Sequence, residues 1–141
     1  MNRRDFFKQS TVAGLASLTG IYLPKTVLAE TDIMNSSLAG NVFYTENNPG
    51  RWNKKVKGHL PTFSLSGKNL EITTGHEMNG YEHYIIKHML FDEKFNFLTE
   101  IMFNPNSDAP ISNHNISGFS NKIYALSLCN KHDAWINSYE I

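Results

Sequence analysis

The segment Lys122-Ile-Tyr-Ala-Leu-Ser-Leu-Cys129-Asn-Lys-His132 joins an apolar run to the only cysteine of the chain and to a histidine three residues beyond it. Residues 122–128 alternate between two sets of apolar side chains with polar interruptions, which favours a β-strand. A lone cysteine cannot form a disulfide within its own chain. Cys129 is therefore either a small buried hydrophobic residue or, together with His132, a ligand for a transition metal.

Outward from this segment, the chain consists of short runs rich in β-branched and aromatic residues. Turn signals such as Asn47-Asn48-Pro49-Gly50 and Asn104-Pro105-Asn106 separate them. We expect strands at residues 60–65, 70–74, 84–91, 95–103, 122–128 and 134–141. Strands of this length with frequent turns predict an all-β sandwich or barrel. No stretch has the pattern of a long amphipathic helix.

Three upstream histidines lie beside these expected strands. His76 and His83 stand on either side of a short loop that contains glycine, and His59 comes just before a strand. Loops at one end of a β-sandwich can bring such residues together, as a metal site requires. Each residue taken alone is more often a solvated or hydrogen-bonded side chain, but H-x6-H together with C-x-x-H is a common pattern for mixed Cys/His ligation.

One thiolate with several imidazoles suits iron or copper better than a structural zinc site, which generally takes a Cys-rich set. A copper carrier of the cupredoxin type is an alternative, because a β-sandwich with C-x-x-H also suits blue copper. Such a site usually adds a methionine after the last histidine. Residues 133–141 contain no methionine, and the histidines outnumber those that blue copper needs.

The N-terminal residues have the features of a signal peptide. Arg3 and Arg4 precede the apolar stretch 11–23, and small or apolar residues end the segment at Ala29. The adjacent arginines resemble those of the twin-arginine (Tat) export route. We therefore expect residues 1–29 to direct export of the folded protein to the periplasm and to be cleaved, so that no membrane anchor remains.

The remaining residues predict a single domain. The chain carries 13 basic and 13 acidic residues; residues 1–29 contain four of the basic and one of the acidic ones, which leaves residues 30–141 with a net charge of −3. This charge argues against a nucleic-acid binder. We expect residues 30–49 to form a weakly structured lead-in and residues 50–141 to form the metal-binding domain.

Several of these motifs together resemble those of the superoxide reductases, the neelaredoxin/desulfoferrodoxin iron-binding domain, over roughly residues 50–138. The segments that carry the resemblance are His59-Leu60-Pro61, His76-x-Met78, Glu82-His83-Tyr84-Ile85, Phe103-Asn104-Pro105, Tyr124-Ala125 and Cys129-Asn130-x-His132-x-x-Trp135. The resemblance implies an immunoglobulin-like β-sandwich of about seven strands with a metal site in loops at one end.

The resemblance also implies the chemistry. It implies one ferrous iron that has four histidines in a plane, one axial cysteine and an open sixth position, and that reduces superoxide to hydrogen peroxide in the response to oxidative stress. The implied ligands are His59, His76, His83, His132 and, axially, Cys129. The remaining histidines, His88 and His114, match no ligand position, and we interpret them as surface or second-shell residues.

The single cysteine excludes the additional iron domain with four cysteines that some family members carry. The implied enzyme would therefore depend on an external periplasmic electron donor, and the family pattern allows a homo-oligomer.

The chain departs from the family pattern at three places. The first ligand usually follows a Glu-Lys pair, whereas Lys57 and Gly58 precede His59 here. We assign the superoxide-attracting role provisionally to Lys57, with Lys55 as the alternative, because lysine is long and flexible. Glu77 replaces a proline after His76, and Asp133 replaces a common glycine after His132. A non-catalytic iron-binding or electron-transfer module on the same scaffold therefore stays open.

Overall fold

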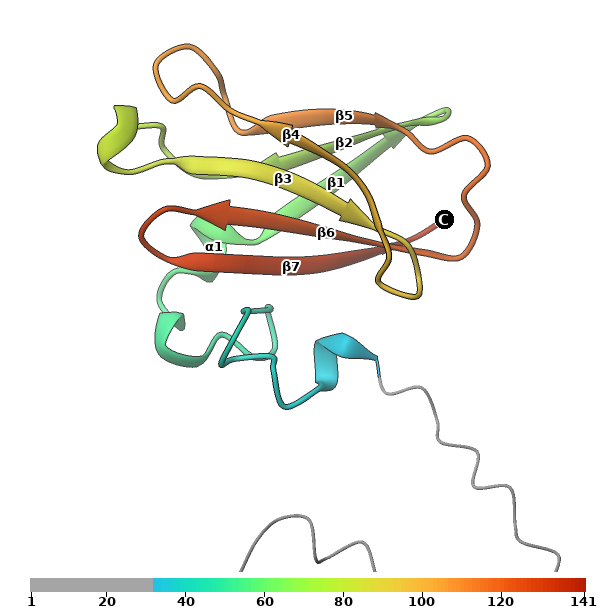
Figure 1. Ribbon diagram of the computed structural model, residues 1–141, viewed down its shortest axis with the longest axis horizontal. Coiled ribbons are helices and arrows are strands. Elements are labelled where there is room, and N and C mark those ends of the chain that lie inside the picture. The colour runs from blue at the N-terminus through green and yellow to red at the C-terminus, as the bar shows by residue number, and fades with distance from the viewer. Residues whose placement is uncertain (1–31) are drawn as a thin grey trace, which may run out of the picture.

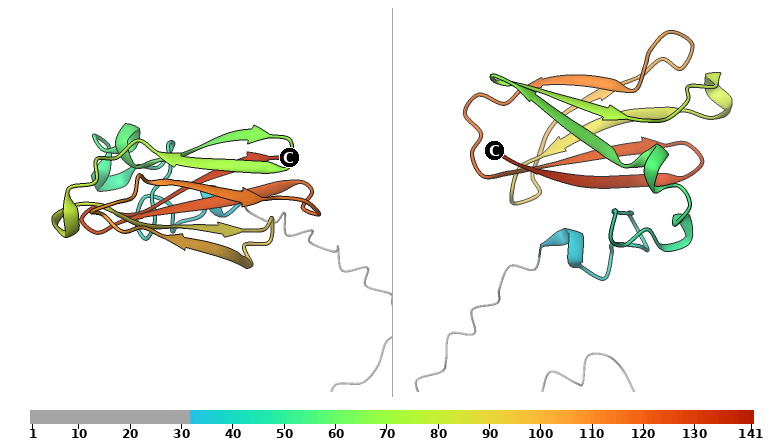
Figure 2. Two further views of the ribbon diagram at one scale, coloured as in Figure 1. Left: turned by 90° about the horizontal axis from the view of Figure 1, so that it is seen from above. Right: turned by 180° about the vertical axis from the view of Figure 1, so that it is seen from behind.

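Seven antiparallel β-strands form two sheets that pack face to face in the computed structural model, which describes residues 32–141 (Figures 1 and 2). The strands are β1 (Pro61–Ser66), β2 (Asn69–Thr74), β3 (Ile85–Phe91), β4 (Phe97–Met102), β5 (Ile111–Asn115), β6 (Lys122–Cys129) and β7 (Asp133–Glu140). The short helices are η1 (Ile33–Asn35), η2 (Gly50–Trp52), α1 (Val56–His59) and η3 (Gly80–Glu82).

One sheet has three strands in the order β1-β2-β5, and the other has four in the order β4-β3-β6-β7. The predicted all-β sandwich is thereby confirmed. The six expected strands are present with small shifts at their ends, and β5 is the strand that the sequence pattern did not predict. In β5 the buried residues are Ser112 and His114, whereas Ile111 is exposed. Polar side chains thus face the core and an apolar one faces solvent, which is the opposite of the usual strand pattern.

Strand β6 is buried on both of its faces. Ile123 and Ala125 pack between the sheets in one apolar cluster, and Tyr124 belongs to a second cluster on the outer face. Phe43 covers that outer face, and the Tyr44 backbone pairs with Trp135 of β7. Three residues of the expected lead-in, residues 30–49, are thus buried in the core: Ala39, Phe43 and Tyr44.

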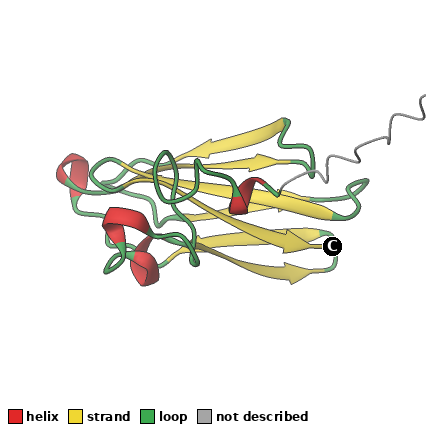
Figure 3. Ribbon diagram, turned by 90° about the horizontal axis from the view of Figure 1, so that it is seen from below, coloured by secondary structure: helices red, strands yellow, loops and turns green. Residues whose placement is uncertain are grey.

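The helical turns η2, α1 and η3 lie at the end of the sandwich opposite the C-terminus (Figure 3). The β6–β7 turn lies at the same end (Figure 1). Strands β2 and β6 end there, and β1, β3 and β7 begin there. Loops distant in the sequence are thus gathered at one end of a rigid scaffold, where side chains can converge.

The predicted signal peptide, residues 1–29, lies outside the described residues. Within residues 32–141, no helix combines the length and the apolar character that crossing a membrane would require.

Candidate metal centre

The structure brings the five predicted ligands together at this end of the sandwich. One donor atom from each lies within 4.8 Å of all the others, in the set His59, His76, His83, Cys129 and His132. His59 ends α1, His76 follows β2, and His83 follows η3, while Cys129 ends β6 and His132 lies in the turn before β7. Cys129 is 2% exposed and belongs to an apolar cluster with Ile85 and Phe103.

The four imidazoles have the spacing of the corners of a square. Around the ring order His76, His83, His132, His59, neighbouring ring centroids are 4.4, 4.9, 4.7 and 4.6 Å apart. Across the square, the rings of His59 and His83 are 6.3 Å apart. Four rings in this order can direct their nitrogens at one central point.

The nitrogen–nitrogen distances fit a bound transition metal. The Nε2 atoms of His76 and His83 are 3.0 Å apart, and His132 Nδ1 lies 3.1 Å from His83 Nε2 and 3.0 Å from His59 Nε2. Two nitrogens that bind one ion at right angles, each about 2.1 Å from it, are separated by about 3.0 Å. The Cys129 sulfur, 3.6 Å from His132 Nδ1 and 3.9 Å from His76 Nε2, supplies the fifth donor.

Backbone carbonyls orient two of the imidazoles. His59 Nδ1 lies 2.9 Å from the Lys55 carbonyl oxygen, and His76 Nδ1 contacts the Glu77 carbonyl oxygen. In each pair the Nδ1–H donates to the oxygen, which leaves Nε2 without a proton and facing the cluster. A histidine that binds a metal usually has such a partner on its other nitrogen.

Asn130 holds the two segments that carry His83 and Cys129 together. Its side-chain oxygen accepts from the Tyr84 backbone N–H at 3.0 Å, and its Nδ2 donates to the Glu82 carbonyl at 3.0 Å. Its own backbone N–H donates to the Tyr84 carbonyl at 3.2 Å. The asparagine of the Cys-Asn-x-His segment thus links the β6–β7 turn to the loop before β3.

Two tryptophans fix His132. Trp135 is fully buried, and its indole N–H donates to the His132 carbonyl at 2.9 Å. Trp52 of η2 packs edge-on against the His132 ring with centroids 4.7 Å apart, and its indole N–H donates to the Asp133 carboxylate at 2.9 Å. Trp135 is part of the recognised motif, whereas no sequence signal singled out Trp52.

The electrostatic environment keeps the imidazoles neutral, the form in which they bind metals. Burial lowers the pKa of His59 to about 4, although its bond to the Lys55 carbonyl acts in the opposite sense. Burial also lowers the pKa of His76, His83 and His132, and the positive charge of Lys55 lowers all three further.

A cavity of about 250 Å³ adjoins three of the histidines. Its lining consists of Lys54, Lys55, Gly58, His59, Gly75, His76, Glu77 and His83. The provisionally assigned Lys57 is exposed in α1 and is not part of this lining. Of the two lysines that the sequence offered for attracting an anion, Lys55 is thus the one that lies beside the cluster, and Glu77 is exposed at the same cavity.

His88 and His114 lie outside the cluster, as expected, but neither is a surface residue. They are 0% and 5% exposed, and both contact the Ser112 hydroxyl inside the sandwich. Of the two interpretations, surface or second-shell histidines, the first is therefore wrong. Polar partners at 2.7 and 2.8 Å compensate for the burial of these rings.

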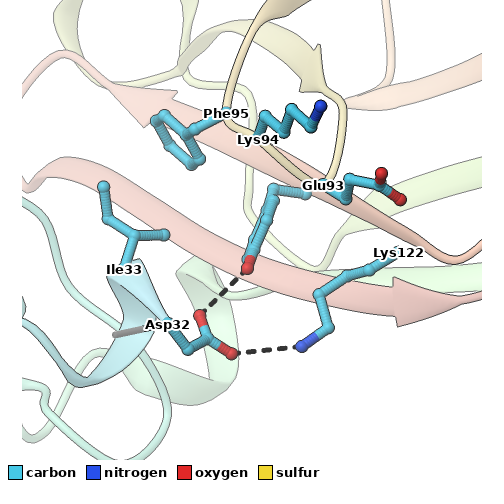
Figure 4. A pocket seen from close by; sticks show the side chains of 7 residues that line it. Asp32, Ile33, Glu93, Lys94, Phe95 and Lys122 are labelled. Carbon is cyan, nitrogen blue, oxygen red and sulfur yellow. Dashed lines mark hydrogen bonds and ion pairs between the residues drawn. The ribbon is translucent and has the colours of Figure 1, made fainter. Parts of the chain in front are cut away.

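A second cavity, of about 400 Å³, lies near the N-terminal end of β6 (Figure 4). Its polar groups bond to one another: Asp32 accepts from Tyr124 at 3.0 Å and from Lys122 at 3.1 Å. Burial and the Asp32 carboxylate raise the pKa of Tyr124 to about 12. Because these groups satisfy each other, we assign no ligand to this cavity.

No protein-family model and no curated protein sequence matches the chain. Several solved structures do match it. The superoxide reductase (neelaredoxin) from Ignicoccus hospitalis aligns with a TM-score of 0.57 and 25% identity, over 72% of this chain and 95% of that chain. The one-iron superoxide reductase from Giardia intestinalis aligns with a TM-score of 0.52 and 25% identity, over 60% of this chain and 99% of that chain.

A variant of the Ignicoccus hospitalis protein aligns with a TM-score of 0.64 and 24% identity, over 72% of this chain and 94% of that chain. This chain therefore has the fold of the superoxide reductases and carries, at one end of it, the cluster of four histidines and one cysteine that the sequence resemblance implies.

Proposed function

We propose that this chain is an exported non-haem iron superoxide reductase that reduces superoxide by one electron to hydrogen peroxide in the periplasm. The observation that carries the proposal is the convergence of four imidazoles and one thiol on a superoxide reductase fold. The twin-arginine pattern of residues 1–29 supports the export, and the solved superoxide reductases support the activity.

The donor set fits iron better than the alternatives. Four histidines with one cysteine are too rich in nitrogen for a structural zinc site and exceed the two histidines of blue copper. Iron held there would supply the single electron that each superoxide takes up. An external periplasmic electron donor would then restore the centre.

The chain's own residues attract the substrate. Superoxide is an anion, and Lys54 and Lys55 line the cavity that opens beside His76 and His83. A positive charge at a concave site raises the encounter rate of an anion. The positive charge of Lys55 also lowers the pKa of His76, His83 and His132, as expected for a charge beside the centre.

The decisive experiment measures superoxide loss and peroxide formation by the iron-loaded protein without oxygen. We expect one peroxide for each superoxide consumed, and a visible charge-transfer band of the oxidised protein that Cys129→Ser abolishes. Unchanged superoxide decay in a protein that binds iron would instead favour a non-catalytic iron-binding or electron-transfer module. A purified protein that contains copper would favour the copper carrier.

The steering role distinguishes the two lysines. We expect Lys55→Ala to slow superoxide consumption by roughly threefold to tenfold and to weaken its dependence on ionic strength, because one positive charge beside the cavity is lost. Lys57→Ala is the matched control in the same helical segment and should react at nearly the wild-type rate. A larger effect of Lys57→Ala would return the role to Lys57, and no effect of either would exclude steering by both.

A further inference from the structure

The two sheets of the sandwich share the cluster. His59 and His76 flank the β1–β2 hairpin of the three-stranded sheet, whereas His83, Cys129 and His132 border strands of the four-stranded sheet. The distances between the two groups therefore depend on how the sheets lie against each other. Apolar packing alone fixes this relation poorly, because the hydrophobic effect has no direction.

A chain of buried polar side chains joins the sheets directly behind the cluster. We call it the inter-sheet cluster; its members are Thr74, His88, Ser112, His114 and Ser127, all of which are at most 5% exposed. Thr74 Oγ1 lies 2.8 Å from both Ser127 Oγ and His88 Nε2, and Ser112 Oγ lies 2.7 Å from His88 Nδ1. These three contacts cross between the sheets, and the fourth joins His114 to Ser112 at 2.8 Å within β5.

The polar groups of the inter-sheet cluster satisfy one another's hydrogen-bonding capacity. Burial holds the pKa of His88 at about 4, so the ring is neutral and has one donor and one acceptor nitrogen. Its Nε2–H can donate to Thr74, which donates in turn to Ser127, while its Nδ1 accepts from Ser112. In the described part of the chain, no buried side-chain nitrogen or oxygen lacks a partner. Hydrogen bonds between such groups require a defined geometry, which apolar contacts do not.

Thr74 connects the inter-sheet cluster to both groups of predicted ligands. It is the last residue of β2, and its carbonyl accepts from the His76 backbone N–H at 2.7 Å. Its hydroxyl bonds to Ser127, which precedes Cys129 by two residues on the same face of β6. On the far side of His88, Phe103 packs edge-on against the ring at 4.9 Å and belongs to the apolar cluster that contains Cys129.

We propose that Thr74 is a positioning residue, whose hydroxyl, bonded to His88 and Ser127, fixes the two sheets so that the His59/His76 pair meets the three ligands of the other sheet. This role rests on the proposed metal site. It also accounts for the reversed polarity of β5, since Ser112 and His114 face inward to complete the inter-sheet cluster.

The test compares two variants of the full chain, one without and one with the hydroxyl at residue 74. Thr74→Val keeps the shape of the side chain and removes both hydrogen bonds, whereas Thr74→Ser keeps the hydroxyl. With Co²⁺ as the probe, we expect Thr74→Val to lower the affinity by about tenfold or more and to weaken the thiolate absorption band. Thr74→Ser should restore both. Equal affinity and equal spectra of the two variants would overturn the proposal. Ser127→Ala, which removes one of the two bonds, replaces Thr74→Val if that variant does not fold.

A control separates positioning from general stability. Ile123 is 1% exposed near the other end of β6, so Ile123→Val weakens the core without touching the inter-sheet cluster. We expect its Co²⁺ affinity to equal that of the wild type. If it lost as much affinity as Thr74→Val, the inter-sheet cluster would act only through the stability of the fold, and the proposal would fail.

A second readout needs no metal. Cys129 is the only cysteine and is buried, so the rate at which a thiol reagent labels it reports local opening behind the site. In the metal-free protein we expect faster labelling of Thr74→Val than of Thr74→Ser and Ile123→Val; equal rates would count against the positioning role. If the wild type bound no metal, the proposed function would fail, but this comparison would still decide whether Thr74 holds the sheets.

Discussion

At the scale of single residues, Asp133 shows how the protein accommodates a departure from the family pattern. Its φ is 64°, in the left-handed region that favours glycine, the residue that the resemblance led us to expect there. Aspartate tolerates this conformation better than most residues. Its carboxylate also bonds to the Trp52 indole and to Arg51, which holds Trp52 against His132.

Substitutions at this position should separate the backbone effect from the carboxylate effect. Asp133→Ala loses the bonds to Trp52 and Arg51 and replaces aspartate with a residue that tolerates positive φ less well, so we expect the free energy of unfolding to fall by about 2 kcal/mol. Asp133→Gly loses the same bonds but removes the Cβ and its strain at positive φ, so it should stay within about 1 kcal/mol of the wild type. Urea denaturation of the metal-free protein measures both. Equal losses in the two variants would show that the positive φ has no energetic role.

At the scale of elements, η2 depends on a close approach between two backbone segments. Gly50, its first residue, has a φ of 47°, and a Cβ there would lie 2.1 Å from the Gly40 carbonyl oxygen and 3.1 Å from the Tyr44 ring. A backbone oxygen cannot rotate away as a side chain can. The lead-in segment and η2, which carries Trp52, can pack together only because residue 50 lacks a side chain.

We expect Gly50→Ala to lower the free energy of unfolding by roughly 2–4 kcal/mol, since overpacking adds to the strain of a positive φ. Gly67→Ala is the matched control. Its φ is 61°, but a Cβ there meets no atom within 4 Å, so only the strain of about 1–2 kcal/mol remains. Thermal or urea unfolding compares the two, and a similar loss in both would mean that the contact with Gly40 does not limit stability.

At the scale of the whole molecule, the buried imidazole of His88 links folding to pH. Its pKa of about 4 in the folded protein lies below the ordinary value of 6.5 because burial disfavours the charged ring. The unfolded chain therefore binds a proton at a higher pH than the folded protein does. The stabilising contribution is complete above about pH 6.5 and is lost as the pH falls towards 4, by on the order of 3 kcal/mol at most.

His88→Gln tests this linkage, because the amide can still donate and accept hydrogen bonds but does not titrate. His59 and His114 also have lowered pKa values, so they too make the folded protein less stable as the pH falls through this range. The informative quantity is therefore the difference between wild type and variant in the slope of the unfolding free energy against pH. Between pH 6.5 and 4, the free energy of unfolding of the metal-free variant should fall less steeply with decreasing pH than that of the wild type. The difference in slope should correspond to the uptake of about one proton fewer on unfolding. Parallel curves for the wild type and the variant would exclude His88 as a source of the acid sensitivity.

The sequence by itself determined the strands with ordinary polarity and the set of residues that converge. Runs such as 84–91 and 122–128 place apolar side chains at strand positions, and this signal is local. Part of the motif around Cys129 is local too, because the Trp135 indole bonds to the His132 carbonyl within the same turn.

Only the tertiary structure decided the rest, because it depends on groups distant in the sequence. Strand β5 was missed because Ser112 becomes favourable inside only when it meets His88 of the other sheet, and His114 in turn bonds to Ser112. Which lysine faces the cluster depends on how α1 turns, and Trp52 reaches His132 only because Gly50 permits a close packing. Such contacts satisfy buried polar groups across the fold, and no periodicity within one segment records them.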